Sequence, residues 1–246
     1  MDNIDIHSHI LYNIDDGSKS IEESINIIKE HIKMGFTDIV VTPHYIENTK
    51  YKSNNKEKKE LLEKLKQELK KQNLNINLYL GNEVFINNNI EELINNNEIA
   101  TINNSRYLLI EFPMNQQPKD LNNIIYELRI KGITPIIAHP ERYDYVEKNP
   151  DVVYEWIEEG ALLQSNYGSI IGIYGSAPQK TIKKLLKKNV ISILATDIHY
   201  PKNKIYMNID TIRKKIIKTI GEEKFIELTI INPKKIIENK EISKNY

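Results

Sequence analysis

The chain has 246 residues, 40% of them hydrophobic, which is enough for one large barrel or two small domains. Its formal net charge of zero argues against a nucleic-acid-binding surface as its main function. Cysteine is absent, which excludes disulfides, zinc–thiolate sites and cysteine nucleophiles. Because we find neither a membrane-length apolar stretch nor a signal-peptide pattern, we expect a cytoplasmic protein without membrane insertion.

Strands and helices alternate along the predicted chain. A strand at Ile4–Ile6 precedes a helix at Ile21–Met34, which Ser18 or Ser20 can cap and Gly35 can end. Six further strands are predicted, at Asp38–Val41, Ile76–Leu80, Tyr107–Ile110, Thr134–Ala138, Ala161–Gln164 and Ile191–Ala195. Further helices are expected at Lys56–Lys71, Leu121–Lys131, Asp151–Glu159 and Gln179–Lys188, with two or three more from about Tyr206. Asparagine-rich segments at 87–89 and 95–97 are expected to form turns and short helix.

The predicted strands are near-continuous apolar runs, as in parallel strands that are covered on both faces. Their alternation with helices indicates parallel βα units, and no Pro/Gly/Ser-rich linker divides the chain. We therefore expect an α/β fold in a single domain over residues 1–246. The lysine-rich helix at 180–188 and the charged segment at 57–71 are expected to be solvated outer helices.

Five of the six histidines follow apolar runs, at the point where α/β folds place their sites. A His-x-His pair alone is weak evidence, but here acids and imidazoles end six separate strands. These residues are His7, His9, His44, Glu83, Glu111, His139, Asp197 and His199. Burying such groups unpaired costs several kcal/mol each, roughly, whereas a bound cation makes their burial favourable. Oxygen and imidazole ligands without thiolate favour Mn²⁺, Fe²⁺ or Zn²⁺.

The order of these motifs resembles the PHP (polymerase and histidinol phosphatase) superfamily. Within it, the chain is most similar to the bacterial metal-dependent tyrosine-protein phosphatases of capsule and exopolysaccharide loci, the CpsB/YwqE group. The resemblance covers nearly the whole chain. It is carried by His7-Ser8-His9, Asp15-Asp16-Gly17, Thr42-Pro43-His44, Gly81-Asn82-Glu83, Leu109-Ile110-Glu111-Phe112, Ala138-His139-Pro140-Glu141-Arg142-Tyr143 and Thr196-Asp197-Ile198-His199.

The resemblance implies a distorted (β/α)7 barrel that holds three divalent metal ions, usually manganese, at the C-terminal ends of its strands. By position, one ion would be bound by His7, His9, Glu83 and Asp197. A second would be bound by Glu83, Glu111 and His139, and a third by Asp16, His44 and His199. Without the resemblance, Asp15-Asp16-Gly17 could equally be an ordinary turn.

The implied activity is hydrolysis of phosphotyrosine on a partner protein, a bacterial tyrosine kinase that controls capsule or exopolysaccharide synthesis. Clustered cations would lower the pKa of a bridging water, which would attack phosphorus directly. Arg142 is expected to bind the substrate phosphate, and the alternative is a salt bridge to Glu141 or Asp144. Glu111 and Arg142 are the predicted catalytic residues.

The chain departs from the family pattern at one position. Members usually have a second arginine a few residues after the Asp-x-His pair, where this chain has Lys202 and Lys204. A lysine is a point charge without the bidentate fork of arginine, which puts the second phosphate contact in doubt.

Three other functions fit the sequence less well. Histidinol-phosphate phosphatase shares the superfamily fold, but Asp16 speaks against that branch. A DNA 3′-exonuclease would need a basic channel, and a non-catalytic scaffold would be expected to lose ligands. His31 lies inside the first helix and is expected to be structural or solvated.

Overall fold

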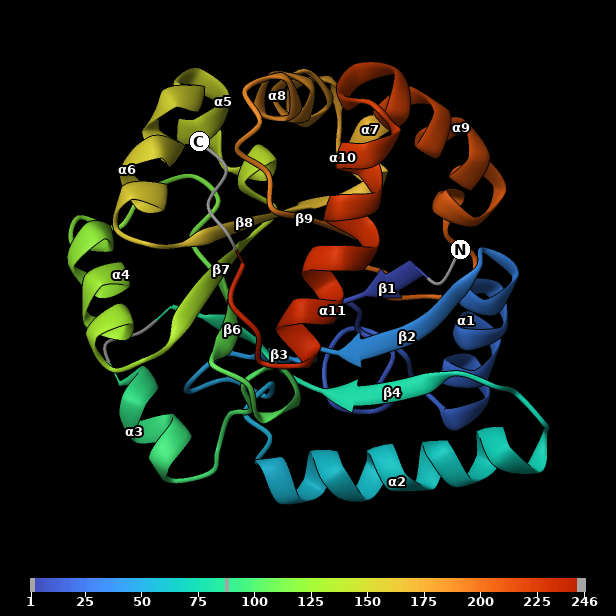
Figure 1. Ribbon diagram of the computed structural model, residues 1–246. Coiled ribbons are helices and arrows are strands. Elements are labelled where there is room, and N and C mark those ends of the chain that lie inside the picture. Colours follow the sequence, from blue (N-terminus) through green and yellow to red (C-terminus); the bar gives the residue numbers. More distant parts are fainter. Residues whose placement is uncertain (1–2, 87–88, 243–246) are drawn as a thin grey trace.

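The computed structural model describes residues 3–86 and 89–242, and these form an α/β fold whose strand pairs are all parallel. Figure 1 shows helices surrounding an inner ring of strands. The strands are β1 (Asn3–Asp5), β2 (Phe36–Val41), β3 (His44–Tyr45), β4 (Asn77–Leu80), β5 (Glu83–Phe85), β6 (Tyr107–Glu111), β7 (Thr134–Ala138), β8 (Leu162–Asn166) and β9 (Ile193–Ala195). All seven predicted strands are therefore confirmed.

The regular strand pairing is interrupted at two short breaks, which divide the barrel wall into two sheets, β1-β2-β4 and β3-β5-β6-β7-β8-β9. Thr42-Pro43 separates β2 from β3, and Gly81-Asn82 separates β4 from β5. Since Pro43 has no N–H to donate, the regular ladder cannot continue through it. Counted across these breaks, the described residues contribute seven strands to the wall.

The wall closes between its first and last strands. Ser8 forms a parallel bridge with Ile198, and the backbone N–H of Asp197 donates to the carbonyl of His7 at 2.9 Å. The N–H of His9 donates to the carbonyl of Ile198, also at 2.9 Å. The predicted distorted (β/α)7 barrel is confirmed.

The outer helices match most of the predicted ones. They are α1 (Ile21–Lys33), α2 (Asn55–Lys71), α3 (Ile90–Asn95), α4 (Leu121–Ile130), α5 (Asp144–Lys148), α6 (Val153–Glu158), α7 (Tyr167–Ile170), α8 (Ser176–Lys187) and α9 (Lys204–Ile220). The chain ends in α10 (Glu222–Ile226), a π-helical turn η4 (Glu227–Ile231) and α11 (Asn232–Ile237). Single 3₁₀ turns lie at η1 (Ile102–Asn104), η2 (Pro140–Arg142) and η3 (Pro150–Val152). Residues 87 and 88 of the expected turn lie outside the described residues.

Local chemistry explains the helix boundaries. Ser20, and not Ser18, caps α1: its side chain accepts a hydrogen bond from the N–H of Glu23 at 3.2 Å. The helix expected at Asp151–Glu159 starts as the 3₁₀ turn after Asn149 and becomes regular only at Val153. In contrast, α8 begins three residues earlier than expected, because Gly175 takes a φ of 107° and Pro178 fits the first turn.

The apolar core has two parts. One lies between the strands and the outer helices, and it includes Trp156. The other fills the barrel interior, where Ile4, Leu109 and Ile193 pack with Ile236 of α11. Figure 1 shows α10 and α11 crossing the barrel, so these helices close its N-terminal end. Within the described residues, no helix is both long and apolar enough to cross a membrane.

Candidate metal centre

Nine side chains gather at the C-terminal end of the barrel, the end opposite α11. Most lie on the last residue of a strand or shortly beyond it, whereas His44 and Glu83 begin β3 and β5 and Asp16 lies in a turn before α1. They are His7, His9, Asp16, His44, Glu83, Glu111, His139, Asp197 and His199. The structure thus brings together every residue predicted as a metal ligand. Most are buried, while the side chain of Asp16 is 50% exposed at the open rim.

Four ligand atoms form the most regular group. The Nε2 atoms of His7 and His9 are 3.2 Å apart, and each lies 3.2 Å from Oε2 of Glu83. Oδ1 of Asp197 is 3.4 Å from the first nitrogen and 3.5 Å from the second. A tetrahedral ion at about 2.1 Å from its ligands separates them by about 3.4 Å, so the distances of the two nitrogens to each other and to each of the two oxygens match those around one cation.

A second group lies on the other oxygen of Glu83. Nε2 of His139 is 3.1 Å from Oε1 of Glu83 and 3.6 Å from Oε1 of Glu111. Oε2 of Glu111 also lies 3.9 Å from Nδ1 of His44. With its two oxygens facing different groups, Glu83 is placed to bridge two ions.

The third group lies nearest the solvent. Oδ1 of Asp16 is 3.7 Å from Nε2 of His44 and 3.6 Å from Nε2 of His199. His9 belongs to this group as well, because its ring stacks on His199 with centroids 3.9 Å apart. The sharing of Glu83 between two groups was predicted, and the groups are less separate than predicted because His9 and His44 are shared as well.

Two side chains that the sequence analysis missed fix the orientation of His7 and His9. Nδ1 of His7 lies 2.7 Å from Oε1 of Gln164, and Nδ1 of His9 lies 2.7 Å from Oδ2 of Asp15. Each pairing places a proton on Nδ1, so Nε2 is the nitrogen that faces the cluster, where a cation can replace its proton. Asp15 also accepts hydrogen bonds from the N–H groups of Gly17 and His44. For Gln164, the available signal was the polar end of the predicted strand Ala161–Gln164, which Ser165 and Asn166 follow.

Gly17 is required by this arrangement. A Cβ at that position would lie 2.1 Å from the carbonyl oxygen of His9, so no larger residue fits without moving the turn. The turn is held by a hydrogen bond from the N–H of Ser18 to the same oxygen. Asp15-Asp16-Gly17 is therefore a turn whose two acids point in different directions. Asp15 contacts His9, and Asp16 lies at the rim.

β8 contributes a buried polar chain that links two candidate ligands. Gln164 contacts His7 through its oxygen and donates from Nε2 to Oδ1 of Asn166 at 2.8 Å. Asn166 in turn donates from Nδ2 to Oδ2 of Asp197 at 2.7 Å. Because both amides are fully buried, this chain sets the side-chain positions of His7 and Asp197 relative to each other.

His31 is structural and not solvated. Its Nε2 lies 3.0 Å from Oδ2 of Asp5, and its Nδ1 lies 3.0 Å from the carbonyl of Ile27. Asp5 also accepts from the hydroxyl of Thr196 at 2.5 Å and from its N–H at 3.0 Å. Thus one buried carboxylate ties α1 to the ends of β1 and β9, from which His7 and Asp197 project.

The backbone is strained at two of the candidate ligands. Among the described residues, ten that are not glycine have positive φ, and eight of these are asparagines, which tolerate that region well. The other two are His139, with a φ of 33°, and Asp197, with a φ of 54°. Backbone strain of this kind concentrates at functional sites, where the surrounding structure holds it in place.

The electrostatics of the cluster show how its charges depend on one another. Burial alone would lower the pKa of His7, but Glu83 and Asp197 outweigh it and raise the pKa to about 9. Burial and repulsion by the same two carboxylates raise the pKa of Glu111 to about 8. Burial, with a smaller effect of Arg142, lowers the pKa of His139 to about 4. Glu111 and His7 must therefore hold protons near neutral pH unless a cation replaces them.

The donor set fits divalent metal ions. Five imidazoles and four carboxylates, without thiolate, match Mn²⁺, Fe²⁺ or Zn²⁺. Nδ1 of His44 is buried and makes no hydrogen bond within the described residues, although Oε2 of Glu83 is 3.1 Å away. An unpaired ring nitrogen next to a buried carboxylate is the arrangement that a shared cation would satisfy.

Arg142 lies at the edge of the cluster, in the 3₁₀ turn after His139. Its Nη1 donates to Oδ2 of Asp197 at 3.0 Å, so the ion pair suggested as an alternative exists, but with a different acid than Glu141 or Asp144. Its side chain is 27% exposed. Lys202 and Lys204 are exposed, and no ion pair joins either lysine to the cluster within the described part of the chain.

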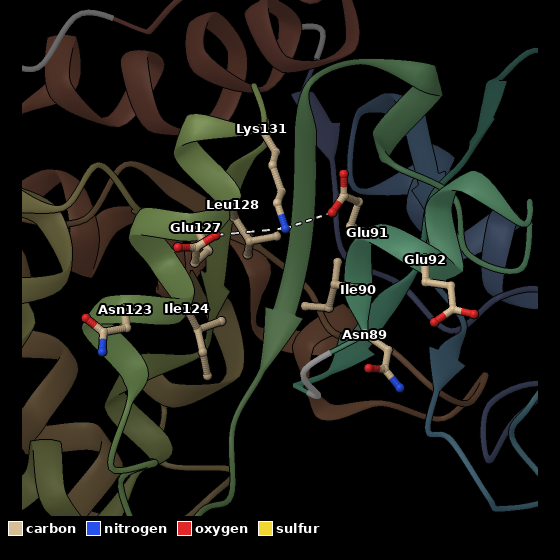
Figure 2. Close-up of a pocket in the computed structure, with 9 residues that line it drawn as sticks. All are labelled: Asn89, Ile90, Glu91, Glu92, Asn123, Ile124, Glu127, Leu128 and Lys131. Carbon is tan, nitrogen blue, oxygen red and sulfur yellow. Dashed lines mark ion pairs between the residues drawn. The ribbon is translucent and has the colours of Figure 1, made fainter.

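A separate hollow of about 390 Å³ lies on the outside of the barrel. Figure 2 shows it between α3 and α4, where Lys131 pairs with Glu91 at 2.7 Å and with Glu127 at 3.9 Å. None of the nine cluster residues lines it. The convergent ligands, and not this hollow, therefore mark the candidate site.

Comparisons with known proteins agree with this geometry. A family model described as "Capsular polysaccharide synthesis, CpsB/CapC" matches residues 3–238. The CapC protein of Staphylococcus aureus is 39% identical over 241 residues, which cover 98% of this chain and 93% of that protein. The tyrosine-protein phosphatase CpsB of Streptococcus pneumoniae is 33% identical over 242 residues, covering 95% and 98%.

A solved structure gives the same result. Its description reads "Crystal structures of YwqE from Bacillus subtilis and CpsB from Streptococcus pneumoniae, unique metal-dependent tyrosine phosphatases". It superposes with a TM-score of 0.90 at 30% identity and covers 98% of this chain and 96% of the solved chain. The chain belongs to the CpsB/CapC family of capsular polysaccharide synthesis proteins.

Proposed function

We propose that this protein is a metal-dependent protein-tyrosine phosphatase that uses three divalent ions, with manganese preferred. The observation that carries the proposal is the convergence of nine ligand side chains beside one guanidinium, at the open end of the barrel. The related CpsB of Streptococcus pneumoniae is named a tyrosine-protein phosphatase, and the superposed structure is described as metal-dependent. In our proposal, the nine residues are the ligands, and the whole chain is one catalytic domain.

Bound divalent ions would supply an activated water at neutral pH and positive charge for the phosphate oxygens. The residues of the chain hold the other parts of the reaction in place. Gln164 and Asp15 hold the Nδ1 proton of His7 and of His9, so that each ring offers Nε2 to a cation, and Glu83 presents its two oxygens to two ligand groups. Glu111, the predicted catalytic carboxylate, would be ionised only with a cation beside it, because its pKa is otherwise about 8.

Arg142 is proposed to bind the substrate phosphate. A guanidinium has five N–H donors, and only one bond, to Asp197, uses its side chain among the described residues. The remaining donors are available for two phosphate oxygens at once. Lys202 and Lys204 are proposed as weaker contributors through their charge, since they lie exposed just after His199.

The leaving group and the open rim favour tyrosine. A phenolate, with a parent pKa of about 10, departs more readily than a serine alkoxide, so a strong general acid is less necessary. The half-exposed side chain of Asp16 shows that the cluster is reachable from solvent. We propose that the substrate is a tyrosine-phosphorylated protein, a bacterial tyrosine kinase of capsule synthesis, and that the enzyme acts in the cytoplasm. The family description supports this context.

A substrate panel tests the proposal. The Mn²⁺-loaded protein is assayed on a phosphotyrosine peptide, a phosphoserine peptide of the same sequence, histidinol phosphate and single-stranded DNA. We expect the highest kcat/KM on phosphotyrosine, loss of activity on chelation and recovery with Mn²⁺. A higher kcat/KM on histidinol phosphate would replace the proposed function with the small-molecule phosphatase, and turnover by metal-free protein would reject the metal-dependent reaction.

A further inference from the structure

Tyr174 stands out among the residues that the proposed reaction does not use. It lies in the turn between α7 and α8, and its ring faces the guanidinium of Arg142, with Cζ 4.4 Å from the ring centroid. Arg142 thus has two partners: Asp197 at one of its edges and Tyr174 on one of its faces. This spacing is within the range of a cation–π interaction.

The turn that carries Tyr174 is built around glycines. Gly172 and Gly175 take φ values of 76° and 107°, which side-chain-bearing residues rarely adopt. A Cβ on Gly168 would lie 3.1 Å from Cε2 of Tyr174, so the ring packs closely against the bare backbone of α7. The turn is also closed by a hydrogen bond from the N–H of Ile173 to the carbonyl of Gly168, at 3.1 Å. The ring position is therefore set by the local fold.

A ring face holds a guanidinium without consuming its donors. A second carboxylate would also fix Arg142, but it would occupy the N–H groups that a phosphate needs and would repel the phosphate itself. An aromatic face attracts the cation through its quadrupole and restricts the plane of the fork, while the edges stay free. Restricting the plane matters because a bidentate contact needs both N–H groups aligned with two oxygens.

We infer that Tyr174 is a positioning residue, which orients the Arg142 guanidinium for the phosphate group of the substrate. The inference rests on the proposed phosphate-binding role of Arg142. Without the ring, the guanidinium can rotate about its one hydrogen bond to Asp197. Phosphate binding then weakens, while the metal ligands keep their positions. The hydroxyl of Tyr174 is not needed for this role, because phenylalanine offers the same face.

The experiment measures the binding of inorganic phosphate to Mn²⁺-loaded protein by calorimetry, together with metal content and peptide kinetics. Tyr174→Leu removes the aromatic face, and Tyr174→Phe keeps it. Tyr154→Leu is the matched control, since Tyr154 lies under Lys188 at 5.6 Å on α6, outside the cluster. We expect Tyr174→Leu to raise the Kd for phosphate about tenfold. Tyr174→Phe and Tyr154→Leu should stay within about twofold, with full metal content in all three.

A double-mutant cycle separates positioning from general packing. In an Arg142→Met background, Tyr174→Leu should cause no further loss of phosphate binding, because the cation that the ring holds is gone. Gly168→Ala displaces the ring without removing it, so this variant should also weaken phosphate binding. It replaces Tyr174→Leu in the test if that variant fails to fold. Wild-type binding by Tyr174→Leu, or an equal loss in both backgrounds, would overturn the inference.

The outcomes also separate this inference from the proposed function. If the wild-type protein hydrolyses no phosphotyrosine but the contrast in phosphate binding holds, the proposed substrate is wrong and the role of Tyr174 stands. If phosphotyrosine is hydrolysed and Tyr174→Leu matches wild type in Kd and KM, the inference is wrong and the proposed function stands. If wild-type protein binds no phosphate, the inference falls together with the role of Arg142.

Discussion

At the scale of single residues, two of the candidate ligands each depend on a second side chain that orients the first. His7 and His9 present Nε2 to the cluster, and Gln164 and Asp15 accept a hydrogen bond from Nδ1 of each ring. Eight of the nine facing side chains were predictable from their places at strand ends, and Asp16 was predicted only by the family resemblance. Their supporting partners were not, since an amide on a strand or an acid in a turn has many ordinary roles. Only the closed fold shows which imidazole each one contacts.

The first prediction concerns Gln164. Gln164→Leu removes the acceptor that fixes the ring of His7, so the affinity for metal should fall by about 10- to 100-fold, as is typical for such partners. Activity should return at high Mn²⁺, because the ligand itself remains. Metal titration followed by elemental analysis measures this, with Gln67→Leu on the exposed face of α2 as the control. Unchanged metal affinity in Gln164→Leu would show that the amide does not orient His7.

The second prediction concerns the pH dependence of Glu111. Because its folded pKa is about 8 and an ordinary glutamate titrates near 4.5, the metal-free native state binds the extra proton between these values. The contribution of Glu111 to the free energy of unfolding therefore decreases as pH rises from about 5 to 8. Glu111→Gln should remove that decrease, and it should also reduce turnover by orders of magnitude with saturating metal. Urea unfolding of both proteins in chelator, at pH 5 to 8, checks the stability part. Parallel pH profiles would contradict it.

At the scale of elements, the breaks in β2/β3 and β4/β5 place ligands that regular strands would not. His44 and Glu83 each follow a two-residue break and pair with one another in the register of β3 with β5. The strands themselves could be predicted from their apolar runs. The breaks could not, because Pro43 and Gly81 also suit an ordinary strand end. Space at Gly81 is tight, since a Cβ would lie 3.1 Å from Cγ1 of Val40, which would have to shift slightly.

α2 supports the second break with a buried lysine. Lys58 lies on the inward stripe of α2, between Asn55 and the leucines Leu62, Leu65 and Leu69. Its Nζ donates to Oδ1 of Asn82 at 2.7 Å and to the carbonyl of Glu98 at 2.9 Å. The expectation of a solvated helix was therefore wrong at this position. Asn82 precedes Glu83, so the lysine holds the backbone from which that carboxylate projects.

The third prediction uses the charge of Lys58. Burial lowers its pKa to about 7, against the opposing effect of Glu57 and Glu98, whereas an unfolded lysine titrates near 10.4. Between these values the unfolded state binds more protons, so this group makes the protein more stable as pH rises. Relative to Lys58→Met, the wild-type protein should gain up to about 1.4 kcal/mol per pH unit from pH 7 to 9. Urea unfolding measures the difference, and Lys59→Met on the exposed face should show no such gain. A flat difference would mean that Lys58 stays charged when buried.

At the scale of the whole molecule, the two ends of the barrel are built differently. The N-terminal end is apolar and closed by α11, with Ile236 packed inside, whereas the C-terminal end holds the nine candidate ligands. The patterns within single strands predicted parallel βα units and the ligand end, and the family resemblance implied the barrel. The sequence did not predict how the C-terminal helices close the other end. That contact joins segments more than 200 residues apart, such as Ile4 and Ile236, and no local pattern specifies it. The single-domain organisation stays a prediction.

The last prediction follows from where the ligands originate. Since they come from strand ends all around the wall, bound ions would join segments that are otherwise held only by the barrel ladder and its core. Metal that binds the native state alone stabilises it by about 2.7 kcal/mol per site at one hundred times its Kd. For a chain of this size, each kcal/mol shifts the Tm by about 2–4 °C. Mn²⁺ added to chelated protein should therefore raise the Tm by at least about 5 °C, and Mg²⁺ should raise it less, because the site is rich in imidazole. The double variant His7→Ala/His9→Ala should lose most of the Mn²⁺ shift. An equal shift in that variant would place the stabilising ion elsewhere on the protein, even if the activity still required metal.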